Sequence, residues 1–348
     1  MFDMLSDNGE WAISQKGSEV DGSLAPSGGV IYNLATKAQT DISHSSGLSG
    51  VADITDDGSI VVGECQGRPA YWSKSTGEWT LLPTPSGYRA GRLNSVTPDG
   101  HFAVGYVTPP DFSWGAYPVA YDLTKGELLS TEGIPTLDIT NLDQHQNCFY
   151  SISSDGRYIL GSLSVSYILP ASLCSYLYDI QEHTYKMIGF TENHSGAWKP
   201  KWDNLYFVDS PQMSHYGKFV TGCAYIVENN GTEFGTEYSS TFKSDVEKDE
   251  FTVFNKEGEN DVIGFQILND GAIYAVSPAS NPYASMLVRS GNYFVDLNNI
   301  FSQVYGIDFK ALTNYTNTGK PISVSEDGLT VLMLPNPDET YLLIGIGG

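Results

Sequence analysis

A short turn recurs seven times along this chain of 348 residues and constrains its fold more than any other feature. The clearest copy lies in CFYSISSDGRYILG at 148–161, where Ser-Ser-Asp-Gly stands between two apolar runs. Such an Asp-Gly pair is a strong hairpin signal, because glycine accepts positive φ and the aspartate side chain bonds nearby backbone N–H groups. The copies are centred on the turn glycines Gly9, Gly58, Gly100, Gly156, Gly217, Gly271 and Gly328.

The residues around the turn glycine repeat as well. Asp precedes it in five of the seven copies, whereas the divergent fifth copy has Tyr216. The position four before it is apolar in every copy, and we expect all seven of these side chains to be buried: Leu5, Ile54, Val96, Ile152, Met213, Ile267 and Val324. Another glycine follows five residues later in four copies: Gly63, Gly105, Gly161 and Gly222.

The repeat predicts an all-β chain. The turn glycines are 42 to 61 residues apart, a spread that four-stranded units with loops of variable length explain. We therefore predict a single domain over residues 1–348, a seven-bladed β-propeller with four-stranded antiparallel blades; six blades is the alternative, because the fifth unit is degenerate. The expected blades cover residues 2–43, 50–83, 93–131, 148–190, 207–255, 262–297 and 321–348, the last without its fourth strand.

Between the last two units, apolar residues at helical spacing over 297–304 predict one short amphipathic helix. The remaining long connections fall on one side of the units, opposite the tight turns. They include Gly17–Gly28, Thr108–Ala116, Thr131–Asn147, Gly189–Leu205 and Glu228–Glu237. Loops on a rigid scaffold carry function, so this long-loop face is where we expect a ligand.

Two groups of residues on that face are candidate ligand-binding residues. The aromatic group consists of Trp198, Trp202, Tyr206, Phe112 and Trp114. Such rings stack on sugars or anchor a protein partner, although they could instead fill gaps between blades. The second group is Arg89 and Arg92, which could bind a carboxylate or acidic sugar; the alternative is that they form surface ion pairs.

Charge and composition exclude several classes. With 18 basic and 41 acidic residues the formal net charge is −23, which disfavours nucleic acid and anionic membranes as partners. We expect no transmembrane segment, because no run of about 20 apolar residues occurs. The four cysteines (Cys65, Cys148, Cys174 and Cys223) form no C-x-x-C pair, and Asp138, Asp143 and His145 fit no known calcium loop. We therefore expect no metal and no cofactor.

The turn pattern resembles the HAF-type repeat, in which S-x-D-G is followed by a strand, a glycine and later an aromatic strand. The resemblance is carried by 55–63 with Tyr71 and Trp72, by 97–105 with Tyr121, and by 153–161 with Tyr178; residues 294–330 resemble the family's C-terminal stretch. It implies a secreted or surface-associated bacterial protein. The first residues of this sequence contain no signal peptide, so a cytoplasmic location is the alternative.

No catalytic motif or catalytic residue stands out, so the sequence leans away from an enzyme. The favoured function is a monomeric, non-enzymatic binding or scaffold propeller that recognises a glycan or a protein partner through its long-loop face. The alternative is a carbohydrate-active hydrolase or lyase with an axial pocket. That alternative would need two carboxylates about 5–10 Å apart.

Overall fold

The computed structural model describes residues 4–20, 23–45, 49–109, 116–135, 145–165, 172–192, 198–201, 205–228, 236–254, 263–276, 286–290, 293–304, 306, 320–336 and 340–345. The chain divides into two compact units. Unit 1 comprises residues 1–171 and 176–186, and unit 2 comprises residues 172–175 and 187–348.

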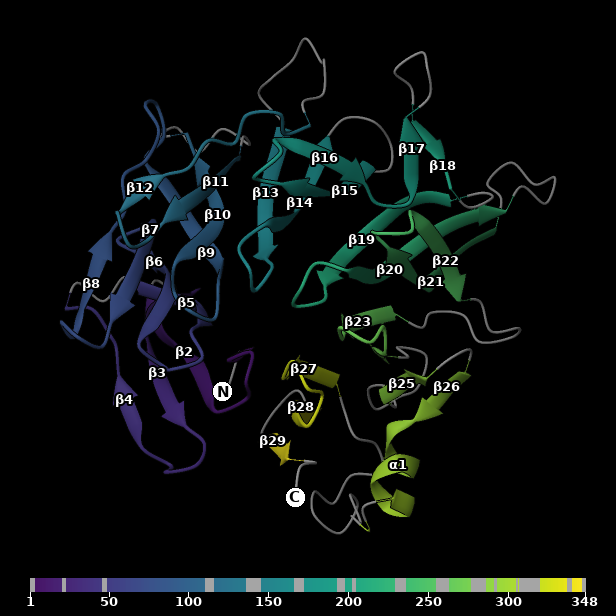
Figure 1. The fold of residues 1–348 in the computed structure, drawn as a ribbon. Helices are drawn as coiled ribbons and strands as arrows, with labels where there is room; N and C mark the ends of the chain where they lie inside the picture. The colour runs from purple at the N-terminus through teal and green to yellow at the C-terminus, as the bar shows by residue number, and fades with distance from the viewer. Residues whose placement is uncertain are drawn as a thin grey trace. The chain divides into compact units, whose positions relative to one another are not determined.

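Unit 1 is built from consecutive sheets in which neighbours along the chain are also neighbours in the sheet (Figure 1). The first contains β1 (Met4–Leu5), β2 (Trp11–Val20), β3 (Ser23–Asn33) and β4 (Gln39–Asp41). The second contains β5 (Ser49–Ile54), β6 (Ile60–Cys65), β7 (Arg68–Ser73) and β8 (Glu78–Leu81). The third contains β9 (Ala90–Val96), β10 (Phe102–Thr108), β11 (Tyr117–Asp122) and β12 (Glu127–Leu128). The fourth, whose strands are divided between the two units, contains β13 (His145–Ile152), β14 (Tyr158–Val165), β15 (Ser172–Asp179) and β16 (Thr184–Met187).

Unit 2 continues the same pattern. One sheet contains β19 (Leu205–Met213), β20 (Phe219–Glu228), β21 (Thr236–Asp245) and β22 (Glu250–Phe254). The next contains β23 (Ile263–Ile267), β24 (Ile273–Val276), β25 (Met286–Ser290) and β26 (Tyr293–Asp296). A three-stranded sheet contains β27 (Lys320–Val324), β28 (Thr330–Asn336) and β29 (Thr340–Gly345). The expected helix is confirmed as α1 (Leu297–Val304).

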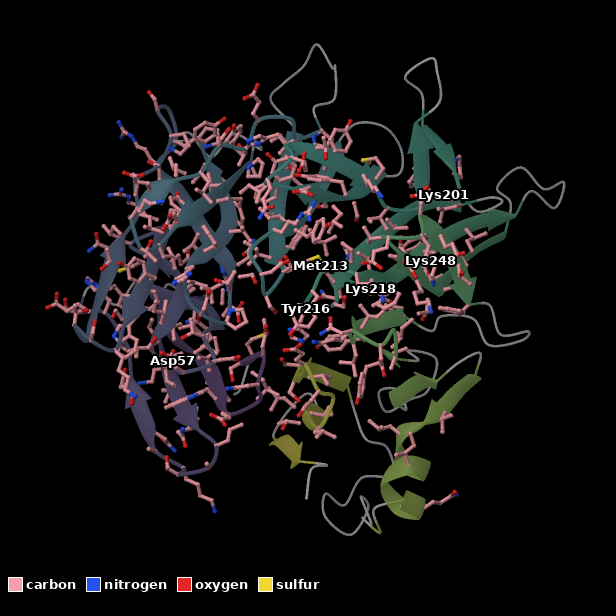
Figure 2. All side chains as sticks on the ribbon, viewed as in Figure 1. Asp57, Lys201, Met213, Tyr216, Lys218 and Lys248 are labelled. Atoms are coloured by element: carbon pink, nitrogen blue, oxygen red, sulfur yellow. The ribbon has the colours of Figure 1, made fainter. Side chains whose placement is uncertain are left out.

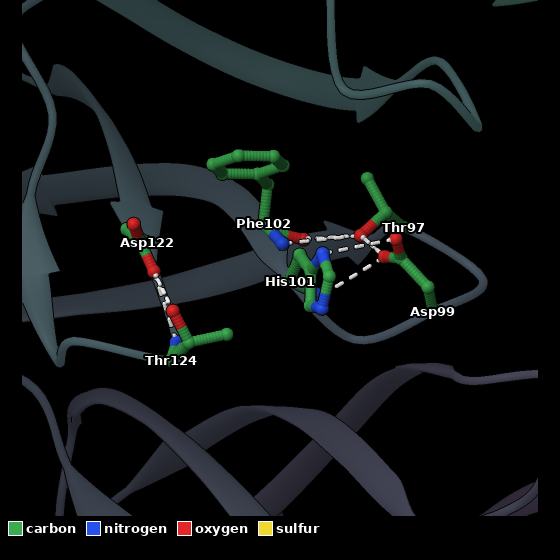
Figure 3. A network of polar contacts seen from close by, with 6 residues as sticks. All are labelled: Thr97, Asp99, His101, Phe102, Asp122 and Thr124. Carbon is green, nitrogen blue, oxygen red and sulfur yellow. Dashed lines mark hydrogen bonds and ion pairs between the residues drawn. The ribbon is translucent and has the colours of Figure 1, made fainter.

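The recurring turns join the first two strands of each sheet, as the sequence predicts, and side-chain hydrogen bonds stabilise them. In the third sheet the Thr97 hydroxyl donates to Asp99 Oδ1 at 2.6 Å, and the same oxygen accepts the His101 N–H at 3.0 Å (Figure 3). The Phe102 N–H donates to Thr97 Oγ1 at 3.0 Å, and Gly100 adopts φ +74°. The hydroxyl and the carboxylate therefore satisfy the backbone groups that a tight turn leaves unpaired.

Each described first strand from the second sheet onward contains a β-bulge near the turn. The register shifts lie between Val51 and Asp53, between Phe149 and Ser151, and at the matching places in the other sheets. The glycine five residues after the turn glycine faces this bulge. At Gly63 and Gly105 a Cβ atom would lie 2.0 Å from a carbonyl oxygen of the first strand, so no other residue fits there.

The apolar position four before the turn glycine is buried in six sheets, with exposed fractions of 0–8%. The seventh member, Met213, is only half-buried, so that expectation was wrong for it. The register shift between Asp209 and Gln212 is the bulge found at this place in the other sheets, and an additional shift between Leu205 and Phe207 distinguishes this strand from the others. Met213 and Tyr216 both belong to the fifth repeat, the most divergent in sequence (Figure 2).

Two expectations about loops were wrong. Residues 17–28 were expected as a loop, but the β2–β3 ladder continues to the Val20–Ser23 pair after a register shift at Lys16 and Gly17. The small residues of this stretch satisfy their backbone groups by pairing with each other. The connection over 189–205 contains an unexpected two-stranded sheet of β17 (Phe190–Glu192) and β18 (Trp198–Pro200).

Candidate functional site

A cavity of about 570 Å³ opens beside the third sheet, among the connections of the long-loop face. Its lining comes from the segment before β9, the start of β11, the end of β12 and the segment after β12: Pro85, Tyr88, Tyr117, Pro118, Val119, Leu128, Leu129, Ser130, Thr131 and Glu132. All these segments lie at the end of the strands that is opposite the tight turns. We call this the tyrosine pocket, after the two rings that dominate it.

The first ring is placed by a compact turn over residues 85–88. The Tyr88 N–H donates to the Pro85 carbonyl at 3.1 Å, and the Thr84 hydroxyl donates to the Tyr88 carbonyl at 2.9 Å. Gly87, at φ +90°, supplies the backbone conformation that closes the turn. The next residue, Arg89, donates its N–H to the Thr108 carbonyl at 3.2 Å and so fixes the turn to the end of β10.

The second ring stands at the start of β11. The centroids of the Tyr117 and Tyr88 rings are 5.4 Å apart and the rings are tilted by 38°. Tyr117 is 37% exposed, and its hydroxyl lies 3.3 Å from Thr131 Oγ1 on the opposite wall. Burial, followed by the neighbouring Tyr117, raises the pKa of Tyr88, so the Tyr88 hydroxyl stays neutral near pH 7.

The wall over Ser130–Glu132 is held by the fourth sheet. The buried Tyr178 hydroxyl donates to the Glu132 carbonyl at 2.6 Å and lies 2.9 Å from His183 Nδ1. Gly133, at φ +79°, lies so close to the His183 carbonyl that a Cβ would be 2.1 Å from its oxygen. The pocket is thus a preformed, partly apolar cleft with hydroxyl groups and one carboxylate at its rim.

The structure separates the residues that the sequence singled out. Arg89 is exposed beside the tyrosine pocket, whereas Arg92 lies within β9, is partly buried, and donates Nη2 to the Val51 carbonyl at 2.8 Å. Phe112, Trp114 and Trp202 lie outside the described residues. The backbones of Trp198 and Tyr206 belong to β18 and β19, but their side chains are not described. These five remain candidates.

Sequence reasoning missed both halves of the aromatic pair as a site. Neither residue is among the candidate ligand-binding residues of the sequence analysis, although Tyr117 closes the connection that contains Phe112 and Trp114. The signal that could have found them is their position. Both stand where a connection enters a strand of the same sheet on the long-loop face, β9 in one case and β11 in the other.

The most perturbed carboxyl group in the described part of unit 1 belongs to Asp53, in β5. It accepts the Ile54 N–H at 2.8 Å, and the Ser95 hydroxyl and the Val96 N–H at 3.0 Å each. Burial, followed by the nearby Asp7 carboxylate, raises the pKa of Asp53 to about 7 against the lowering effect of these hydrogen bonds. A raised pKa of this kind is a common property of catalytic acids.

A comparison within the chain gives Asp53 a structural role instead. Gln266 occupies the same place in β23, five residues before its turn glycine. Its Oε1 accepts the Val324 N–H at 3.1 Å and its Nε2 donates to the Val324 carbonyl at 3.1 Å. Val96 and Val324 are equivalent positions of the following sheets. The Gln266 amide therefore bonds the backbone of Val324 in the way that the Asp53 carboxyl group bonds the backbone of Val96. The shared function is to satisfy backbone groups next to the bulge.

Comparison with solved structures identifies the fold. Oligogalacturonate lyase in complex with manganese matches with a TM-score of 0.62 at 12% identity, over 98% of this chain and 86% of that chain. Kuenenia stuttgartiensis hydrazine synthase matches with a TM-score of 0.55 at 12% identity, over 98% and 94%. These neighbours are β-propeller proteins. This chain has the β-propeller fold. At such low identity the likeness extends to the fold alone.

Porphyromonas gingivalis dipeptidyl peptidase 4 also matches, with a TM-score of 0.53 at 9% identity, over 98% of this chain and 51% of that chain. No family model and no curated protein matches the sequence. The resemblance to HAF-type repeats, the single domain and the number of blades therefore stay predictions. Within the described residues, no helix is long and apolar enough to cross a membrane, and no group of three or more His, Cys, Asp or Glu side chains could hold a metal ion.

Proposed function

We propose that this β-propeller is a binding protein that recognises a glycan through its long-loop face, with the tyrosine pocket as the contact site. The observation that carries the proposal is the tilted pair of rings, Tyr88 and Tyr117, in a cavity rimmed by hydroxyl groups. Aromatic faces pack against the apolar C–H surfaces of a sugar, while hydroxyls and a carboxylate bond its hydroxyl groups. Secretion or attachment to the cell surface, and a monomeric state, belong to the same proposal.

The charge of the pocket favours a neutral sugar. Among the described residues that line it, the only charged one is Glu132, which is exposed at the rim. Together with the net charge of −23, this carboxylate would repel an acidic sugar, whereas it accepts hydrogen bonds from neutral hydroxyl groups. Arg89 stands nearby on the exposed surface and would bring only a weak, solvent-screened attraction for an anion.

The lining also favours binding over bond cleavage at this place. Hydrolysis of a glycosidic bond generally requires two carboxyl groups that flank the bond. The described pocket lining supplies one, Glu132, and it is exposed at the rim. The tyrosine pocket therefore has the composition of a recognition site.

A glycan array followed by calorimetry tests the proposal. The wild-type protein should bind at least one neutral glycan, and Tyr117→Ala and Tyr88→Ala should each weaken that binding by about 2 kcal/mol, roughly thirtyfold in Kd. Tyr216→Ala is the matched control, because Tyr216 is 55% exposed on a tight turn in unit 2 and should leave the affinity unchanged. Unchanged affinity in both pocket variants would overturn the proposal. A release assay on any glycan that binds separates recognition from cleavage.

A further inference from the structure

A second group of polar side chains lies on the first and second strands of unit 1, apart from the tyrosine pocket. The position six residues after the turn glycine is polar in all four of its sheets: Gln15, Glu64, Tyr106 and Ser162. Two of these form a hydrogen bond with a first strand, of the next sheet in one case and of the same sheet in the other. Gln15 accepts the Val51 N–H at 2.8 Å, and the Ser162 hydroxyl donates to the Tyr150 hydroxyl at 3.2 Å.

Arg92 points into this group from β9. It is directly opposite Tyr106 in the β9–β10 ladder, and its Nη2 donates to Val51 of β5 at 2.8 Å. Its Nε is buried without a hydrogen-bond partner, and in the described part of the chain Arg92 forms no ion pair. This is unusual in a protein with 41 acidic residues, because a partly buried guanidinium costs free energy unless an anion neutralises it.

Glu64 approaches the same place from β6 and is equally unpaired. It is partly buried and makes no side-chain hydrogen bond or ion pair with any described residue. Its carboxylate lies over Gly50 of β5, where a Cβ atom would be 3.1 Å from Glu64 Oε1 and 3.4 Å from Gln15 Oε1. The absence of a side chain at Gly50 therefore lets the Glu64 carboxylate pack closely over the backbone of β5.

Tyr106 is directly opposite Arg92 in the β9–β10 ladder, and both charges influence its hydroxyl. Burial raises the pKa of its hydroxyl; among the smaller effects, the Arg92 guanidinium lowers it and the Glu64 carboxylate raises it. Arg92 reaches the carbonyl of Val51 and Glu64 lies over Gly50, the preceding residue of β5, yet the two side chains form no ion pair with each other. The bond to the Val51 carbonyl restrains the Arg92 side chain at this place.

We propose that Glu64, Arg92 and Tyr106 form a binding site for a small zwitterion, a molecule that carries both a carboxylate and an ammonium group, such as an amino acid. Arg92 would pair with the carboxylate and Glu64 with the ammonium group, while the Tyr106 hydroxyl bonds either. A simple anion would leave Glu64 without a partner, and a simple cation would leave Arg92 without one. A zwitterion satisfies both charges and adds no net charge to the protein.

Isothermal titration calorimetry with glycine, β-alanine and γ-aminobutyrate tests this proposal, with acetate and ethylamine as comparators. The three amino acids differ only in the distance between their charges, so the best binder reports the separation that the site accepts. We expect one of them to bind at least about tenfold more tightly than either comparator. Arg92→Gln and Glu64→Gln should each abolish that preference, and Gly50→Ala should weaken binding because the added methyl group would displace the Glu64 carboxylate. Arg89→Gln and Glu78→Gln, which alter exposed charges elsewhere in unit 1, are the matched controls.

Each result decides the proposal in one direction. A preferred amino acid whose binding is lost in Arg92→Gln and Glu64→Gln, but kept in both controls, supports it. Acetate binding as tight as that of any amino acid would overturn it in favour of a plain anion site. No binding by any of the five compounds, or equal binding in all variants, would also overturn it. Circular dichroism and urea unfolding establish that each variant is folded, and because the tyrosine pocket is untouched, failure here leaves the glycan proposal standing.

Discussion

Gly156 lies against the ring of Phe102, so closely that a Cβ atom on the glycine would be 2.6 Å from Phe102 Cδ2. Gly156 is the turn glycine of the fourth sheet, and Phe102 stands two residues after the turn glycine of the third. The same relationship joins Gly58 to Trp11 at 2.5 Å and Gly271 to Phe219 at 3.5 Å. The turn glycine thus has two tasks: it adopts positive φ, and it receives a large side chain of the preceding sheet.

These two tasks can be separated by mutation. Gly77 adopts φ +70° and has open space around it, whereas Gly156 adopts φ +74° and meets the Phe102 ring. We expect Gly77→Ala to lower the free energy of unfolding by about 1–2 kcal/mol through backbone strain alone. Gly156→Ala should lower it by roughly 1–3 kcal/mol more, through overpacking. Urea unfolding of the two variants checks this, and equal losses would show that the contact with Phe102 does not matter.

The sequence predicts the turns well because their chemistry is local. Asp99 and Thr97 stabilise a turn that contains only neighbouring residues, so the pattern of one short segment is sufficient. The sequence does not predict which side chains bond the backbone of the next sheet, as Asp53 and Gln266 do. The bulge interrupts the alternation of the first strand, so the similar positions of Asp53 and Gln266 cannot be recognised from periodicity.

The tyrosine pocket could not be predicted for a similar reason. Tyr88 and Tyr117 are 29 positions apart in the sequence. Their rings are in contact only because two connections enter the third sheet at the same end of its strands. The β17–β18 hairpin was missed because its strands are three residues long and lie in a stretch rich in polar residues. The pairing partner, rather than the composition of the segment, determines that they are strands.

The pH dependence of stability should contain an acid-side contribution from Asp122. This buried residue accepts a hydrogen bond from the Thr124 hydroxyl at 2.5 Å (Figure 3). It also accepts one from the Lys125 ammonium group at 2.6 Å, and these two groups hold its pKa at about 2. A lowered pKa in the folded state stabilises the fold above the ordinary pKa of the carboxyl group, and this stability is lost as the pH falls through about 2.

Asp122→Asn should therefore be more destabilising near neutral pH than at low pH, because the wild-type advantage depends on the charged carboxylate. Unfolding in urea at about pH 6 and about pH 2.5 measures both differences. Lys125→Met should reduce the same pH dependence, since it removes the largest cause of the lowered pKa. A destabilisation of Asp122→Asn that does not change with pH would contradict this prediction.

Asp53 should make the protein less stable as the pH rises, which is opposite to the effect of Asp122. Its pKa is raised to about 7, so the folded state holds a proton that the unfolded chain has released above about pH 4. Stability from this group is then present at low pH and is lost as the pH rises through about 7. Between about pH 5 and about pH 8 the wild-type protein should lose on the order of 2 kcal/mol from this source. Asp53→Asn, which cannot ionise, should show a flatter dependence in urea unfolding over the same range. A slope equal to that of the wild type would show that Asp53 is already ionised at pH 5.

The last prediction concerns how the tyrosine pocket keeps its shape. The Tyr178 hydroxyl donates to the Glu132 carbonyl and contacts His183 Nδ1, so it fixes the wall over Ser130–Glu132 from the fourth sheet. Tyr178→Phe removes this hydroxyl and leaves the Glu132 carbonyl without that donor. We expect a loss of about 1–2 kcal/mol in stability and, because the wall is no longer held, a loss of about three- to tenfold in affinity for the glycan.

Tyr274→Phe is the matched control for this change. The buried Tyr274 hydroxyl also donates to a backbone carbonyl of the next sheet, that of Gly328 at 3.1 Å, but in unit 2. It should cost a similar amount of stability and leave the glycan affinity unchanged, as measured by urea unfolding and calorimetry on the same preparations. If the two variants lose affinity equally, the effect of Tyr178→Phe is a general consequence of lower stability, and the Tyr178–Glu132 hydrogen bond has no special part in shaping the pocket.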